Sequence, residues 1–155
     1  MFMLNMRCSV FSAAFLLAGF GLHAQDVPSG WKVVKDRQGA CQLAVPADWE
    51  ADKLRPSFTK SPDGKSNAVP HGLRAGQPFP DAMVLAKQVT PPSKMIEDSA
   101  KRVWYTYQGA GTPGGGTDWY VAVAGSPICA AQITFKSPVT EDTAKKIALS
   151  LTQAK

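Results

Sequence analysis

The chain has 155 residues, of which 45% are hydrophobic and 19% charged, a composition typical of a globular protein and not of a disordered or polytopic membrane protein. The formal net charge is +5, and the basic residues are spread along the chain without a long block, so no nucleic-acid-binding surface is predicted. Three Cys and two His leave few residues for metal or triad chemistry, and we expect no metal site and no cofactor.

The first residues have the pattern of a Sec-type signal peptide. A basic start with Arg7 precedes an almost wholly apolar run from Cys8 to Leu22, and the small residue Ala24 stands before the polar part. The run is shorter than the about 20 apolar residues that a membrane span needs. We therefore expect a signal peptide over 1–24 and one folded domain over 25–155, periplasmic or secreted, with no transmembrane span after cleavage. An uncleaved N-terminal anchor is the alternative.

Removal of this leader would leave two cysteines, Cys41 and Cys129. An even number of cysteines in an oxidising compartment favours a disulfide. A bridge across such a long loop is worth about 4–5 kcal/mol in the chain-entropy model. Two free buried thiols, which behave as small hydrophobic groups, are the alternative. We predict the disulfide.

Short apolar runs in the first half of the expected domain predict strands. These strands are expected over residues 31–35, 41–45, 57–60 and 65–69. The last two flank Ser61-Pro62-Asp63-Gly64, in which Pro presets φ and Gly accepts a positive φ, so they should form a hairpin. Residues 36–39 are expected to be a turn, and Pro70 to Pro80 a loop.

The middle of the chain leaves one alternative open. Residues 81–88 fit a short helix with Asp81 as its N-cap, and they also fit a strand. After the proline break at 90–92, Ser93 is a plausible N-cap for a helix over 94–101. This second helix would place four side chains at ion-pair spacing, Glu97 with Lys101 and Asp98 with Arg102.

The last third of the chain predicts a meander followed by a helix. Strands are expected over residues 103–108, 118–125 and 129–136, with a loop from Gly109 to Thr117. Thr140 should cap a helix through about Leu151, with one apolar stripe facing the core. Residues 119–124 are apolar on both faces, which predicts a central strand covered on both sides. The expected fold class is α+β, a mainly antiparallel sheet with helices packed on it.

The order of these elements resembles the PsbP-like superfamily, which is named for the photosystem II extrinsic subunit and includes DcrB-like periplasmic proteins. The matching pieces are Cys41 to Glu50, Phe58 to Val69 and Trp119 to Leu151. The resemblance implies an α/β/α sandwich with a non-catalytic binding or assembly role. The superfamily shares no catalytic residues, so none is carried over to this chain.

Two features of the sequence could carry chemistry. Residues 109–114 match Gly-x-Gly-x-x-Gly, but a strand is expected to follow where a dinucleotide site needs a helix, which favours a flexible hairpin loop. His71 is the one histidine after the expected leader, and no Gly-x-Ser-x-Gly elbow accompanies it. We interpret it as a histidine on a surface loop. The alternative is a small envelope hydrolase or isomerase that uses His71 and the Gly109–Thr117 loop.

Three tyrosines on neighbouring predicted strands, Tyr105, Tyr107 and Tyr120, form a candidate ligand surface. Core packing is the favoured interpretation because buried aromatic side chains dominate protein cores. Solvent exposure would distinguish the two. The sequence as a whole favours an exported, non-catalytic binding or assembly module whose partner is an unknown envelope protein or small ligand. A purely structural envelope component is a third possibility.

Overall fold

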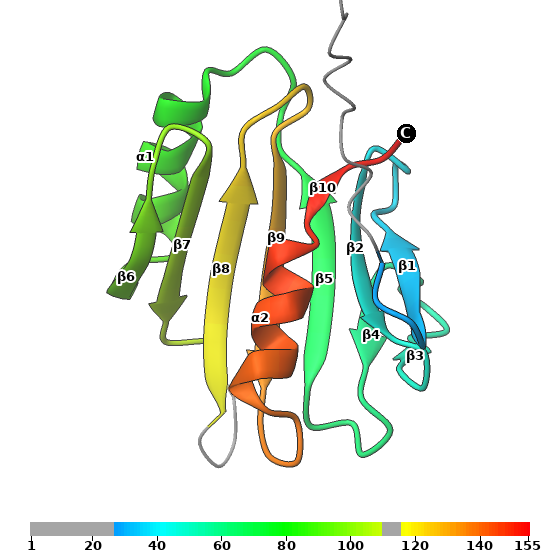
Figure 1. Cartoon of the computed structure of the whole chain (residues 1–155). Helices are drawn as coiled ribbons and strands as arrows, with labels where there is room; N and C mark the ends of the chain where they lie inside the picture. The colour runs from blue at the N-terminus through cyan, green and yellow to red at the C-terminus, as the bar shows by residue number, and fades with distance from the viewer. Residues whose placement is uncertain (1–26, 110–115) are drawn as a thin grey trace, which may run out of the picture.

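The seven-stranded antiparallel sheet is the frame of the molecule (Figure 1). The computed structural model describes residues 27–109 and 116–155, and in these residues it contains this sheet, a three-stranded sheet and two helices. The large sheet has the strand order β3 (Glu50–Ala51), β4 (Thr59–Lys60), β5 (Asn67–Gly72), β9 (Cys129–Phe135), β8 (Thr117–Val123), β7 (Arg102–Tyr107) and β6 (Pro92–Asp98). The small sheet consists of β1 (Trp31–Lys35), β2 (Cys41–Pro46) and β10 (Thr152–Gln153), in that order.

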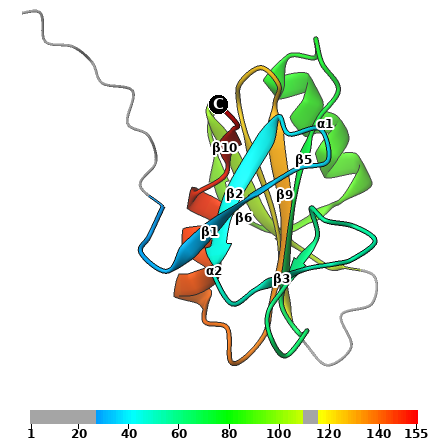
Figure 2. The ribbon, with the colours of Figure 1, turned by 90° about the vertical axis from the view of Figure 1, so that its right-hand side faces the viewer.

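The two helices cover opposite faces of the large sheet. Helix α2 (Glu141–Leu149) crosses in front of β9 in Figure 1, and α1 (Phe79–Val89) lies behind the sheet. Figure 2 shows the sheet from its side, with the helices on either side of it. The predicted α+β class is confirmed, with the helix–sheet–helix layering of a sandwich. The small sheet was not predicted as a separate unit.

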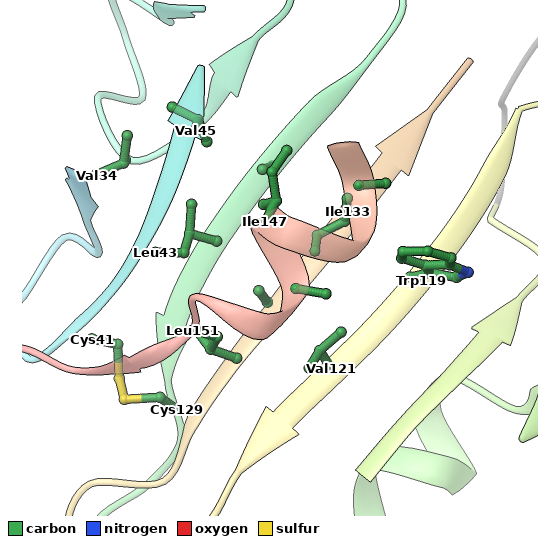
Figure 3. Close-up of a cluster of buried hydrophobic side chains, with 14 of the residues drawn as sticks. Val34, Cys41, Leu43, Val45, Trp119, Val121, Cys129, Ile133, Ile147 and Leu151 are labelled. Carbon is green, nitrogen blue, oxygen red and sulfur yellow. A yellow bond between two sulfur atoms is a disulfide. The ribbon is translucent and has the colours of Figure 1, made fainter. Parts of the chain in front are cut away.

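Strand alternation divides the buried side chains into two cores. Trp119 and Val121 of β8 face α2, where they pack with Ile133 and Ile147 (Figure 3). Their neighbour Tyr120 faces α1 and belongs to the second cluster. Successive side chains of a strand point to opposite faces, so a strand covered on both sides must be apolar throughout. The prediction of a doubly covered central strand is confirmed.

The small sheet is joined to the large one by a disulfide and by a buried carboxylate. Cys41 of β2 and Cys129 of β9 are bonded, with their Cα atoms 5.5 Å apart (Figure 3), which confirms the predicted bridge. Asp36, in the turn after β1, is buried. Its carboxylate accepts hydrogen bonds from the backbone N–H groups of Ala40 at 2.7 Å, Cys41 at 3.0 Å and Gly72 at 3.2 Å. The turn is therefore held to the end of β5.

The predicted helix over 94–101 is wrong, because this segment is the edge strand β6 and the turn after it. The Ser99 hydroxyl accepts the N–H groups of Lys101 and Arg102 and closes a hairpin with β7. Helical ion pairs contribute only tenths of a kcal/mol, which is less than a ladder of strand hydrogen bonds provides. The expected ion pairs are replaced by Arg102–Glu97 at 3.7 Å and Lys87–Asp98 at 2.9 Å.

Residues 81–88, for which the sequence left helix and strand open, are helical. Helix α1 begins two residues earlier than predicted, after Pro78, and Asp81 lies in its first turn and does not cap it. The predicted loop from Pro70 is wrong over its first three residues, because β5 continues to Gly72. Pairing between β4 and β5 ends at Ala68, so Pro70 needs no N–H on that side of the strand.

The predicted cap of α2 is confirmed, since the Thr140 hydroxyl accepts the Thr143 N–H at 3.2 Å. The hairpin around 61–64 is also confirmed by the pairing of β4 with β5.

The expected leader, residues 1–24, lies outside the described residues. Within the described part of the chain, neither helix has the length and apolar character needed to cross a membrane.

Candidate ligand pocket beneath helix α1

His71 and Tyr120, which the sequence analysis treated separately, lie close together in the structure. Their ring centroids are 6.3 Å apart. His71 comes from β5 and Tyr120 from β8, and β9 runs between these strands. His71 is half-buried in a strand, so its assignment to a surface loop is wrong. The reason is that β5 extends past Pro70.

A pocket of about 300 Å³ lies beside these two rings. Its lining combines residues of β5, β8 and β9 with residues of α1 and the segment that leads into it. The lining residues are His71, Leu73, Arg74, Gln77, Ala82, Leu85, Ala86, Val89, Thr90, Tyr120 and Gln132. The volume falls at the lower end of the range seen for small-molecule sites, which are concave and mostly apolar.

The side chains of α1 explain why a space remains under the helix. Phe79 and Met83 pack against the second core, while Ala82 and Ala86 are too short to fill the region beside them. Leu85 and Val89 lie one turn apart, and they are 51% and 84% exposed. Leu85 and Val89 thus form an apolar wall that is open to solvent.

The polar groups of the pocket are uncharged near neutral pH, apart from Arg74. Burial lowers the pKa of His71, although a contact with the Val69 backbone and the charge of Asp36 act in the opposite direction. Burial raises the pKa of Tyr120 to about 12. His71 is therefore largely neutral at pH 7, and Tyr120 keeps its proton and can donate a hydrogen bond.

Tyr120 and Arg74 are among the polar side chains of the pocket that have no partner in the described part of the chain. Tyr120 is only 4% exposed, and none of the described residues hydrogen-bonds to its hydroxyl. Arg74 is exposed at the mouth of the pocket and forms no ion pair with a described residue. Both side chains can therefore donate hydrogen bonds to a ligand that enters the pocket.

The other two tyrosines of the candidate surface do not line this pocket. Tyr105 is completely buried, and it stacks on Tyr120 with centroids 5.2 Å apart. Burial raises its pKa, and its hydroxyl has no partner among the described residues. Tyr107 is half-buried, and burial and the Asp118 charge raise its pKa to about 12. Tyr105 therefore is not available at the surface, whereas Tyr120 packs in the core and also reaches the pocket.

The Gly109–Thr117 loop falls largely outside the described residues, because 110–115 are not among them. Its described ends lie near Asp118, which accepts the Gly109 N–H at 3.2 Å and the Thr134 hydroxyl at 2.6 Å. Asp118 on β8 is paired with Thr134 on β9, and Thr134 is paired with Asn67 on β5. Asn67 lies four residues before His71 on the same strand. Strand spacing places Asp118 about 16 Å from His71, which is beyond hydrogen-bond reach.

A larger groove of about 700 Å³ lies between the small sheet and the turn from β6 to β7. Arg102 lines it, but this guanidinium already faces Glu97 at 3.7 Å. In the described residues, no three His, Cys, Asp or Glu side chains are grouped as metal ligands. The pocket beneath α1 combines an apolar wall with polar side chains that have no partner among the described residues.

The α1 side of this pocket was not predicted from the sequence. The available signal was the pairing of alanines at 82 and 86 with Leu85 and Val89 on one helix. That signal has meaning only if residues 81–88 are helical, and the sequence left the choice between helix and strand open.

Comparisons with known proteins identify a similar fold. No protein-family model and no curated protein matches the chain. A crystal structure from Bacteroides thetaiotaomicron VPI-5482 superposes with a TM-score of 0.52 at 13% identity, over 81% of this chain and 49% of that one. The chain thus spans about half the length of that protein, and at this identity the likeness concerns the fold alone. The solution structure of cyanobacterial PsbP (CyanoP) from Synechocystis sp. PCC 6803 aligns with a TM-score of 0.47 at 10% identity, over 86% of this chain and 98% of that one.

Proposed function

We propose that this protein is an exported, non-catalytic binding module that holds a small ligand in the pocket beneath α1. The observation that carries this proposal is the Tyr120 side chain, which is only 4% exposed, lines an apolar pocket and has no hydrogen-bond partner for its hydroxyl among the described residues. Binding sites commonly combine apolar walls with a few polar groups that orient the ligand. The lining includes no carboxylate, serine or cysteine beside His71, so the pocket favours binding over hydrolysis.

Export is supported by the buried disulfide. Cys41 and Cys129 are bonded, and such bridges persist mainly in oxidising compartments. Residues 1–24 are proposed to direct the chain to the periplasm or out of the cell. We also propose membership of the PsbP-like superfamily. The order of β2, the β4–β5 hairpin, α1, the meander and α2 supports it.

Fractionation of the natural host, with mass spectrometry of the purified protein, tests the export proposal. We expect the protein in the envelope or medium fraction, beginning after Ala24 and with neither remaining cysteine alkylated under native conditions. A protein with an intact Met1 and two alkylatable thiols would contradict it.

Binding is tested on the same exported protein. Ligand-observed NMR with a set of small apolar compounds should give hits that the pocket-filling variant Ala86→Leu abolishes. Hydrolysis of a broad panel of ester, amide and phosphate substrates that His71→Ala eliminates would instead support the enzyme alternative.

A further inference from the structure

The charge of the pocket restricts its ligand. Arg74 is the one side chain with a permanent charge among the described residues that line the pocket. A second hollow adjoins it and shares Arg74, Gln77 and Leu85, and Arg74 is again its one charged lining residue. The guanidinium therefore stands where the two hollows meet, and no acidic side chain of the described residues lines either hollow.

The one cation of α1, Lys87, is already engaged. Lys87 donates to the Asp98 carboxylate at 2.9 Å, which directs its charge toward the end of β6. A ligand in the pocket would thus meet a single positive charge at the mouth and the Tyr120 hydroxyl donor at the base. A ligand with two anionic groups would leave one of them without a cationic partner. A cationic ligand would be repelled by Arg74, with no acidic side chain in the lining to offset the repulsion.

We propose that the pocket takes a small apolar monocarboxylate, whose hydrocarbon part packs along Leu85 and Val89 and whose carboxylate pairs with Arg74. This inference rests on the proposed function, because it specifies the ligand of the same pocket. Arginine binds carboxylates through paired N–H donors, and charge-assisted hydrogen bonds are roughly twice as strong as neutral ones. The pocket volume of about 300 Å³ limits the hydrocarbon part to a short aliphatic chain or a single aromatic ring.

Calorimetric titration of the exported protein with matched compounds tests the ligand class. The probes are short aliphatic and single-ring aromatic monocarboxylates, each compared with the primary amide of the same carbon skeleton. We expect the acids to bind about tenfold more tightly than the amides, as one charge-assisted contact predicts. Arg74→Gln should remove this difference.

Two variants and a control complete the experiment. Tyr120→Phe should weaken the acid and the amide together, because it removes a donor at the base of the pocket. Arg37→Gln removes an exposed arginine in the turn after β1, outside the pocket lining, and should change neither affinity. Arg74 is exposed, so Arg74→Gln should keep the melting temperature of the parent protein.

The outcomes separate the ligand class from the pocket itself. Equal affinities for acid and amide, unchanged in Arg74→Gln and abolished in Ala86→Leu, would overturn the carboxylate assignment and leave the binding function intact. Failure of all probes to bind at millimolar concentration would overturn both.

Discussion

His71 shows how burial gives a single side chain a measurable effect on stability. Its ring lies beside Tyr120 in a strand, and desolvation favours the neutral imidazole. The negative charge of Asp36 favours the protonated imidazole and raises the pKa of His71. This effect is smaller than that of burial, which lowers the pKa. The pKa of His71 in the folded protein is therefore lower than its ordinary value of 6.5.

This lowered pKa predicts a loss of stability under mildly acidic conditions. Above pH 6.5 both folded and unfolded states hold a neutral His71, and below it the unfolded chain binds a proton that the folded chain does not. The free energy of unfolding should thus decrease as the pH falls through 6.5 toward the folded-state pKa. Urea unfolding across this window measures it. His71→Gln should flatten the curve, and an unchanged slope in that variant would assign the effect to other groups.

At the scale of elements, a local sequence signal predicted a helix correctly where one side chain caps the end of that helix. Thr140 was predicted as a cap and is one, because its hydroxyl accepts the Thr143 N–H. Ser93 had the same local pattern, yet it lies in the edge strand β6. The difference is tertiary: residues 92–98 find a partner strand in β7, whereas α2 lays its apolar stripe on β9 and β2.

These two hydroxyls form a matched pair for mutation. Thr140→Ala should lower the free energy of unfolding by about 1 kcal/mol, because it removes a helix cap. Thr140→Ser should retain most of that stability. Ser93→Ala, at an exposed position on β6, should change it by less than about 0.5 kcal/mol. Urea unfolding of the three variants decides the point, and an equal loss for both alanine variants would contradict the assigned roles.

At the scale of the whole molecule, two sheets must be held as one body. The disulfide links β2 to β9, the Asp36 carboxylate links the β1–β2 turn to β5, and the Ser150 hydroxyl after α2 accepts the Ala44 N–H at 2.8 Å. Cys41, Asp36 and Ala44 belong to the small sheet or its turn, so that sheet is held at three points.

Of these three links, the disulfide should contribute the most to the free energy of unfolding. It joins residues separated by 88 positions, and the chain-entropy model gives such a closure about 4–5 kcal/mol. The Cys41→Ala/Cys129→Ala double variant should lose about that much unfolding free energy, measured in urea. The reduced parent protein serves as its control and should show a similar loss. A reduced protein as stable as the oxidised one would show that packing alone holds the sheets together.

The sequence by itself determined the features that depend on few neighbouring residues. Strand alternation located the meander, Pro-Asp-Gly chemistry located the β4–β5 hairpin, and the cap at Thr140 located α2. The even cysteine pair indicated the bridge. Each signal is local or a matter of counting, so it can be read without knowing which elements meet.

Only the tertiary structure decided the identity of 79–98 and the existence of the pocket. Residues 92–98 became a strand because β7 offered an edge, and 79–89 became a helix because Met83 could pack onto the second core. His71 and Tyr120 are far apart in sequence and met only when β5, β9 and β8 took their places in the sheet. A pocket is a space between elements, and no single segment of sequence contains the contacts that form it.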